Sequence, residues 1–170
     1  IYAQDEIPLG DNIIATMGLR YDYFHLENEF SESNLSPKMA AVWKASDVMS
    51  VRLLFAQAFR NPSMAERYIK FEQGGGLRFE PNPQLRAEKL TASVELGSIY
   101  KLGKTTSLDV AIFHNKYRDL ISFRQLPDPK GGLLYKVINL NKAVMQGFEI
   151  NLRSRFLGFI STSLGYTFLD

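Results

Sequence analysis

Residues 58–90 read AFRNPSMAERYIKFEQGGGLRFEPNPQLRAEKL and make the one long interruption in a chain of short alternating segments. A strand-like run ends at Arg60, and another begins near Glu88. Two Asn-Pro steps and a run of consecutive glycines lie between these points. A connection this long is uncommon in a compact domain and is usually functional or disordered. We interpret it as an elaborate surface loop, and the neighbouring segments indicate what carries it.

The remainder of the chain alternates apolar and polar residues, which is typical of β-strands. In residues 13–24, Ile13 and Met17 lie on one face, whereas Arg20 and Asp22 lie on the other. About eight such segments are expected, at 1–7, 13–24, 36–45, 51–59, 90–101, 108–123, 133–156 and 160–168. The pattern therefore predicts an all-β protein without a long helix.

The connections between these segments alternate in length. Short connections are expected at 8–12, 46–48, 102–104 and 157–159, and longer ones at 27–35, 61–87 and 125–132. An antiparallel up-and-down transmembrane β-barrel, with short turns on one rim and long loops on the other, has this rhythm. A soluble β-sandwich, the alternative from another class, has no reason to alternate loop length. A spanning strand needs only about 9–11 residues, half of them apolar, which agrees with 45% hydrophobic residues overall.

The polar faces of these strands carry many small residues and few charges. Arg20, Asp22, Arg52, Glu95 and Asp109 are among the charged side chains there. This composition suits a water-filled or plugged barrel interior in which opposite charges pair, rather than a face in bulk water.

Composition also argues against several classes of function. The chain has no cysteine, so disulfides and thiolate metal sites are excluded, and His25 and His114 stand too far apart to predict a metal site. We expect no metal, no cofactor and no catalytic residues, since no spaced nucleophile motif is present. The basic residues are scattered, so no nucleic-acid binding is expected. Ile1 does not begin a signal peptide, so it was removed or the chain is an internal piece of a longer one.

Short motifs along the chain resemble those of the TonB-dependent outer-membrane receptors, and they come in that family's order. They are Gly18-Leu19-Arg20-Tyr21-Asp22, Ser36-Pro37-Lys38, Ala58-Phe59-Arg60-Asn61-Pro62-Ser63, Glu66-Arg67-Tyr68, Asn82-Pro83-Gln84-Leu85, Glu88, Glu95-Leu96-Gly97, Phe113, Tyr117, Asp119-Leu120-Ile121, Asn139 and Gly147-Phe148-Glu149. Each motif is short, and the specificity lies in their common order and spacing. The resemblance covers nearly the whole chain and matches a stretch in the C-terminal half of the receptor barrel.

This resemblance implies a location and a function. Residues 1–170 would be part of a single barrel domain, a fragment of a plugged 22-stranded barrel in the bacterial outer membrane, without the plug. The receptor would be no enzyme but would bind and import a scarce nutrient, a ferric siderophore by family frequency. Expected partners are the lipid bilayer and lipopolysaccharide, a small-molecule metal chelate, and the TonB energy-coupling complex acting through the plug and N-terminus. Haem receptors commonly carry a histidine between two of the motifs, and residues 63–81 contain none, which argues against haem.

The long loop holds the candidate ligand-binding residues Arg67, Tyr68, Phe71, Arg78 and Phe79. Arginines make charge-assisted hydrogen bonds to anionic chelates, and aromatic rings offer flat contact surfaces. In the alternative interpretation, the aromatics pack the loop, and its arginines pair with Glu66, Glu72 and Glu80. We favour that alternative for Arg60 and Arg67, whose motif in the receptor family looks architectural.

Two further features of the loop predict local structure only. Ser63 and Glu66 have capping-box spacing, which predicts a helical turn from Ser63 to about Tyr68. The glycine run at 74–76 is followed by Leu77 and Arg78 rather than Lys and Ser or Thr, so it predicts a flexible loop tip and not a phosphate loop.

Two other architectures remain open from the pattern. A self-contained eight-stranded barrel with a structural or adhesive role can close and fill its interior with side chains. A soluble β-sandwich binding module would fold in water without detergent. A barrel fragment would instead aggregate or stay unfolded in water, because its strand edges and lipid-facing stripe are bare.

Overall fold

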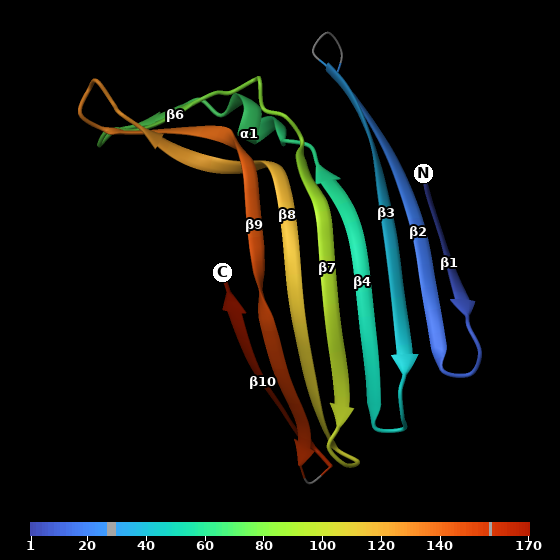
Figure 1. Ribbon diagram of the computed structural model, residues 1–170. Coiled ribbons are helices and arrows are strands. Elements are labelled where there is room, and N and C mark those ends of the chain that lie inside the picture. The colour runs from blue at the N-terminus through green and yellow to red at the C-terminus, as the bar shows by residue number, and fades with distance from the viewer. Residues whose placement is uncertain (27–29, 157) are drawn as a thin grey trace. The chain divides into compact units, whose positions relative to one another are not determined.

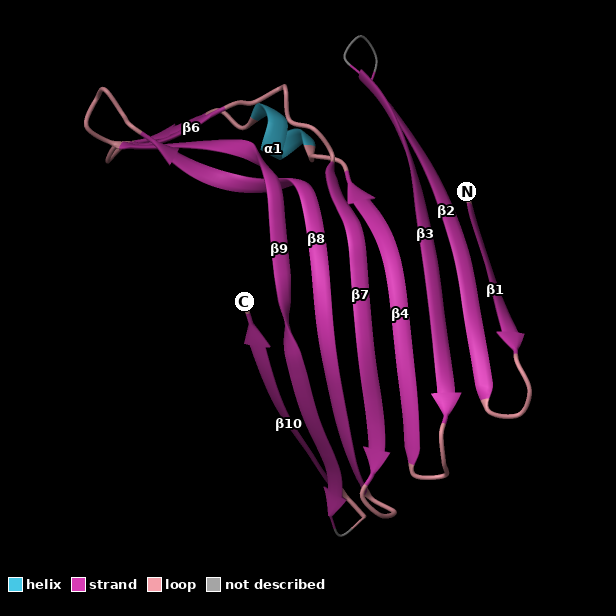
Figure 2. Cartoon of the chain, viewed as in Figure 1, coloured by secondary structure: helices cyan, strands magenta, loops and turns pink. Residues whose placement is uncertain are grey.

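The computed structural model describes residues 1–26, 30–156 and 158–170, and these residues form mostly β-strands (Figures 1 and 2). The described part contains ten strands and one short helix: β1 Tyr2–Pro8, β2 Ile13–Leu26, β3 Phe30–Lys44, β4 Met49–Arg60, α1 Met64–Tyr68, β5 Phe71–Gln73, β6 Leu77–Glu80, β7 Glu88–Lys101, β8 Thr106–Leu126, β9 Leu133–Phe156 and β10 Ile160–Leu169. Within these residues, no helix is long and apolar enough to cross a membrane. The eight long strands are the eight predicted from alternation.

The chain divides into two compact units. The first comprises residues 1–58, 92–116 and 144–170, and the second comprises residues 59–91 and 117–143. Strands β4, β7, β8 and β9 contribute residues to both units, since each of them runs through a boundary.

The first unit is a sheet whose strands follow the chain order β1-β2-β3-β4-β7-β8-β9, with β10 beside β9. The turns at 9–12, 45–48 and 102–105 lie together at one end of this sheet (Figure 1). Among the described residues, β1 pairs only with β2 and β10 only with β9, so the sheet is open. The eight-stranded barrel alternative requires β1 and β10 to pair with each other.

The β2–β3 hairpin corrects one expectation from the sequence. Residues 30–35, predicted as part of a long loop, belong to β3, and the ladder continues to the pair Leu26↔Phe30. Residues 27–29 lie outside the described part. Polar composition suggested a loop here, but the antiparallel ladder is made by backbone groups and continues regardless of side-chain polarity.

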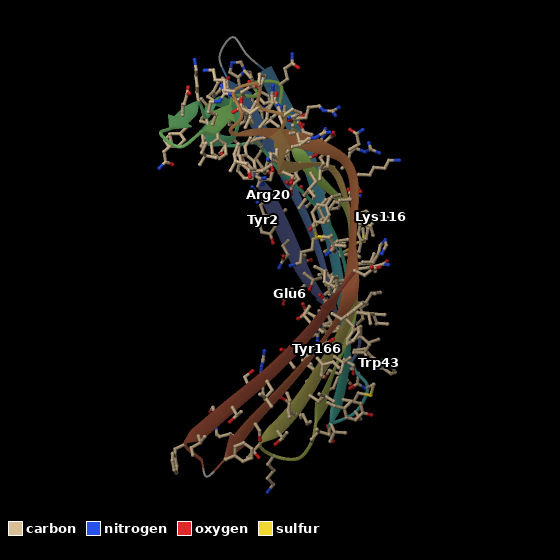
Figure 3. All side chains as sticks on the ribbon, turned by 90° about the vertical axis from the view of Figure 1, so that its left-hand side faces the viewer. Tyr2, Glu6, Arg20, Trp43, Lys116 and Tyr166 are labelled. Carbon is tan, nitrogen blue, oxygen red and sulfur yellow. The ribbon has the colours of Figure 1, made fainter. Side chains whose placement is uncertain are left out.

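The two faces of the first unit differ as the alternation predicts. Register places Glu6 opposite Thr16, and Ile13 opposite Trp43, on opposite faces of the sheet. Figure 3 shows Glu6 and Arg20 on one side and Trp43 on the other. Large apolar side chains on the Trp43 face are exposed, including Met17, Leu19, Met39, Leu53, Ile112 and Leu164. Exposed apolar area on this scale marks a surface made to contact something other than water, here lipid.

The polar face of the first unit pairs its charges, as the sequence predicts for a barrel interior. The Arg52 guanidinium donates to the Glu95 carboxylate at 2.8 Å and to the Asp109 carboxylate at 2.7 Å, joining β4, β7 and β8. Gly97 leaves room for this arrangement, because an added Cβ there would overlap the Arg52 guanidinium. Arg20 pairs with Asp22 on β2.

Candidate functional site

The long loop, which lies in the second unit, has more regular structure than its sequence indicates. Helix α1 forms as predicted: the Ser63 side chain accepts from the Glu66 backbone N–H, and the Glu66 carboxylate accepts from the Ser63 backbone N–H. Beyond the helix, β5 and β6 form a small antiparallel hairpin that the alternation did not predict. Its turn at 74–76 has Gly75 and Gly76 at positive φ, 111° and 87°, where glycine is favoured.

Charged side chains fasten the start of the loop to its end. Arg60 donates to both carboxylate oxygens of Glu66, at 3.0 and 2.9 Å, and to Glu88 at 3.2 Å. Glu88 also accepts the backbone N–H of Ile121 on β8 at 3.0 Å. The predicted pairing of Arg60 with Glu66 is confirmed, and Glu88 links the helix cap, the loop return and β8.

Arg67, on helix α1 within the loop, is buried, with 4% of its surface exposed. Its guanidinium donates to the Pro83 carbonyl at 2.9 Å, and its own carbonyl accepts the Asn82 backbone N–H at 2.7 Å. The Asn82 side chain in turn donates to the Val137 carbonyl on β9 at 2.8 Å. In this contact Arg67 holds the loop together, as the alternative interpretation predicted, through a backbone carbonyl. Its pairing with a glutamate stays a prediction.

Asn139 joins three segments that are far apart in sequence. Its side-chain carbonyl accepts the Arg86 backbone N–H at 2.9 Å. Its amide donates to the Arg86 carbonyl at 3.0 Å and to the Asp119 carbonyl at 2.7 Å. Asp119 is almost buried, has φ of 55°, and pairs with Arg86 at 2.6 Å. One amide thereby connects the loop return to β8 and β9, and the neighbouring Leu85 and Ala87 are buried.

The β5–β6 hairpin is fastened separately to β9 and its preceding turn. β6 pairs with β9 in parallel, from Leu77↔Leu133 to Glu80↔Lys136. Arg78 forms two hydrogen bonds with Asp128, whose carboxylate also accepts the backbone N–H groups of Lys130 and Gly132. The pairing of β6 with β9 and the contact of Arg78 with Asp128 therefore both hold the hairpin in place.

A pocket of about 440 Å³ lies at this hairpin. Phe71, Arg78 and Phe79, three of the predicted ligand residues, line it together. The Phe79 ring stacks on Tyr135 with 5.6 Å between centroids and meets Phe123 edge-on at 6.1 Å. The other lining residues are Lys70, Glu72, Glu80, Pro81 and Leu134.

The structure does not bring all five predicted ligand residues together. Arg67 is buried where it donates to the Pro83 carbonyl, and Tyr68 does not line the pocket. Ligand binding by the five residues stays a prediction. Three of them, Phe71, Arg78 and Phe79, share one pocket. Lys70, a cation next to Phe71 in the sequence, lines the pocket but was not among the predicted ligand residues. Among the described residues, no group of three or more His, Cys, Asp or Glu side chains is arranged to hold a metal ion.

Acid is expected to loosen the loop. Burial opposes ionisation of Glu66, but hydrogen bonds from Arg60 and Ser63 outweigh it and lower the pKa of Glu66 below its ordinary value of 4.5. The Lys130 backbone N–H, with Arg78, lowers the pKa of Asp128 below its ordinary value of 3.8. Carboxylates with lowered pKa values contribute stability that is complete above the ordinary pKa and is lost as pH falls through the lowered one.

Pepsin, which cleaves in acid, measures this loss. Cleavage between residues 69 and 81 should begin as pH falls below 4.5 and increase further below 3.8. The double variant Glu66→Gln/Asp128→Asn should cleave with little dependence on pH across the same range. An unchanged onset in the double variant would exclude these two carboxylates as the cause.

Gly132→Ala is expected to detach the hairpin from β9. An added Cβ would overlap the carbonyl oxygen of Gly76, which accepts the Leu133 backbone N–H at 2.8 Å. Backbone cannot move aside as a flexible side chain does, so we expect about 1–3 kcal/mol of local destabilisation. Faster hydrogen exchange at Leu133 and in 77–80 would report it. Gly131→Ala, whose added Cβ meets no neighbour but whose φ of 79° is strained, controls for turn strain.

Comparison with known proteins places the chain in a family. The family model described as TonB dependent receptor-like, beta-barrel matches residues 1–170. The chain belongs to the TonB-dependent receptors. The resemblance and the β-barrel fold predicted from the sequence are thereby confirmed, and the location is the outer membrane.

Several relatives of this TonB-dependent receptor chain carry names that refer to iron compounds. The heme/hemopexin utilization protein C of Haemophilus influenzae is 27% identical over 88% of this chain and 24% of its own length. The ferrienterobactin receptor of Escherichia coli is 27% identical over 89% of this chain and 21% of its own length. The structure of the siderophore receptor PirA from Pseudomonas aeruginosa matches 99% of this chain and 34% of its own, at 25% identity and a TM-score of 0.77. The chain thus spans about a quarter of the curated relatives' length.

Proposed function

We propose that the receptor containing this chain binds a ferric siderophore at the β5–β6 hairpin and imports it with energy delivered by the TonB complex. The observation that carries the proposal is the pocket in which Phe71, Arg78 and Phe79 meet. The names of relatives such as the ferrienterobactin receptor and the siderophore receptor PirA support the choice of cargo. Because the chain spans about a quarter of its curated relatives, transport by the whole protein is part of the proposal.

The pocket chemistry favours an anionic chelate that carries flat aromatic groups. Phe71 and Phe79 offer ring faces and edges, and aromatic pairs gain energy beyond the area they bury. Arg78 and Lys70 supply positive charge to a ligand carboxylate or catecholate. Of the two lining carboxylates, Glu80 is close to Lys136, at 3.8 Å, which partly offsets its charge. A ferric catecholate chelate combines the two properties that the pocket recognises.

Haem is the competing cargo, since one relative is named for heme and hemopexin. Residues 63–81 contain no histidine that could ligate haem iron from this loop. The pocket also has both a cation and a carboxylate on its wall, Arg78 and Glu72, rather than an apolar slot. Hemin is therefore one of the iron sources compared in the experiment, and no second function is proposed.

Uptake of radioactive ferric iron tests the function. Cells lacking their other iron receptors would express the full-length protein and receive a ferric catecholate, a ferric hydroxamate or hemin as the sole iron source. We expect catecholate uptake that requires TonB and is lost when residues 71–80 are replaced by a Gly-Ser linker. As the control, residues 9–12, a turn of the first unit, are replaced by a Gly-Ser linker of the same length as that turn. Catecholate uptake that survives the hairpin replacement, or uptake of hemin alone, would contradict the proposal.

A further inference from the structure

The lipid-facing side of β8, in the first unit, changes from apolar to polar along the strand. Asp109 lies on the polar face of the sheet, so the even-numbered residues around it in β8 lie on the opposite face. Ile112 is 56% exposed there, and the next two positions on that side are His114 and Lys116. Figure 3 shows Lys116 on the same side of the sheet as Trp43. Polar chemistry therefore begins at His114 on a surface that is otherwise apolar.

A chain of hydrogen bonds crosses three segments at this level. Nδ1 of His114 is 2.9 Å from Oε1 of Gln146 on β9, and the Gln146 amide donates to the Asp170 carboxylate at 3.2 Å. Because an amide oxygen only accepts, His114 donates from Nδ1. Within the described residues, no other group of the chain bonds to His114. The imidazole is thus held in one orientation, with Nε2 left for a partner outside the chain.

The distance along β8 places these residues at the outer edge of the membrane. Thr106 begins β8 next to the short turn at 102–105, on the rim that faces the periplasm in barrels of this kind. Lys116 is ten positions further along, which at about 3.3 Å a residue is about 33 Å of strand. With a strand tilt of about 40°, this is about 25 Å along the barrel axis, close to the height of the apolar band. His114 and Lys116 therefore lie where the acyl chains of the outer leaflet give way to headgroups.

This surface points out of the barrel. β8 lies between β7 and β9, and the face on which Arg52 pairs with Asp109 is the one that faces the barrel interior. The opposite side, with His114 and Lys116, faces the outer membrane, whose outer leaflet is built from lipopolysaccharide. The headgroup of that lipid carries phosphates and sugar hydroxyls, so its chemistry complements a cation and a hydrogen-bond acceptor.

We propose that His114 and Lys116 bind the phosphorylated glucosamine headgroup of lipopolysaccharide. The Lys116 ammonium pairs with a headgroup phosphate, and Nε2 of His114, about 6.6 Å away along the strand, accepts a sugar hydroxyl. Gln146 and Asp170 position the imidazole without touching the lipid. The acyl chains lie against the apolar side chains nearer the short turns, of which Ile112 is the first on β8. A phospholipid offers the same phosphate and acyl chains, so it serves as the competitor.

Binding of fluorescent lipid A, the glucosamine anchor of lipopolysaccharide, tests this site in the full-length receptor stripped of lipid in a neutral detergent. We expect His114→Phe/Lys116→Gln to weaken binding by about tenfold or more, because hydrogen bonds to a charged and to a neutral group are lost. Lys116→Arg keeps the charge and should bind lipid A as the wild type does. Lys104→Gln removes a charge at a short turn of the same unit and should leave binding unchanged.

Removing the phosphates from lipid A separates the two contacts. The wild type should bind dephosphorylated lipid A about tenfold more weakly than lipid A, whereas Lys116→Gln should bind the two forms alike. Gln146→Met should weaken binding by a smaller factor than His114→Phe and leave the preference for the phosphorylated form intact, as a positioning role requires.

Three results would overturn the proposal. The first is lipid A binding by His114→Phe/Lys116→Gln that equals that of the wild type. The second is an equal loss in Lys104→Gln, which would show that net charge alone attracts the lipid. The third is displacement of lipid A by phosphatidylglycerol at the same concentration as unlabelled lipid A, or a lower one, which would assign the site to phospholipid.

Discussion

Replacing Asn139 by Ala is expected to cost the loop return about 1–3 kcal/mol of local stability. The variant removes one acceptor and one amide that together satisfy the Arg86 N–H, the Arg86 carbonyl and the Asp119 carbonyl. The Asp119 carbonyl lies in a partly buried site, where a backbone group left without a partner loses more than an average hydrogen bond contributes, whereas the exposed Arg86 groups would bond to water. The variant would therefore lose the side-chain hydrogen bonds that join the loop return and β8 to β9.

Hydrogen exchange of the full-length protein measures this effect at residues 82–88. Asn34→Ala is the matched control, because the Asn34 side chain donates to the Leu35 carbonyl and the Ser36 hydroxyl beside it and joins no segments that are far apart in sequence. Asn139→Asp keeps the acceptor for the Arg86 N–H and removes both donated bonds, so it should fall between wild type and Asn139→Ala. Exchange in 82–88 that Asn139→Ala leaves unchanged would show that the buried Leu85 and Ala87 hold the return without this amide.

Arg78→Gln is expected to weaken binding of the ferric chelate by about tenfold to a hundredfold. The guanidinium lines the pocket with Phe71 and Phe79 and brings a positive charge to it. Isothermal titration of the purified receptor with a ferric catecholate measures the change. Phe79→Leu, which keeps apolar volume and removes the ring that stacks on Tyr135, should weaken binding by a smaller factor.

Arg78 also holds the hairpin through Asp128, so its two roles need to be separated. Asp128→Asn removes the ion pair and keeps the Arg78 charge. Its one side-chain oxygen can replace only one of the two carboxylate oxygens that accept the Lys130 and Gly132 N–H groups. If Arg78 binds the ligand, Asp128→Asn weakens binding much less than Arg78→Gln does, because the cation stays in the pocket although the hairpin is held less firmly. If Arg78 only positions the hairpin, Asp128→Asn weakens binding as much as Arg78→Gln does.

The long strands were predictable because their periodicity is intrinsic to each segment. In β2, Met17 and Arg20 lie on opposite faces because successive side chains of a strand point to opposite sides. The pairing register with β3 continues this separation of faces on the neighbouring strand. Residues 30–35 were misjudged because polar composition says nothing about backbone ladder bonds. The short strands β5 and β6 have too few residues to show a period, and β6 takes its partner from β9, far away in the sequence.

The candidate site was predictable in part. Phe71, Arg78 and Phe79 were chosen by residue type, and the hairpin brings them to one pocket. Arg67 has the same chemistry as Arg78 but is buried, and burial depends on Pro83 and on β9 rather than on its own neighbours in sequence. Asn139 was visible as a motif residue, whereas its role depends on Arg86, which a sequence reading cannot place beside it.

The central claim is that an anchored loop presents the β5–β6 hairpin to a ferric chelate. Hydrogen-exchange mass spectrometry of the full-length receptor, with and without a ferric catecholate at saturating concentration, tests it most directly. The account predicts increased protection in residues 70–81 and little change in the loop return at 82–88, which Asn139 and Glu88 already hold. Ligand-dependent protection that appears elsewhere while residues 70–81 stay unchanged would contradict it.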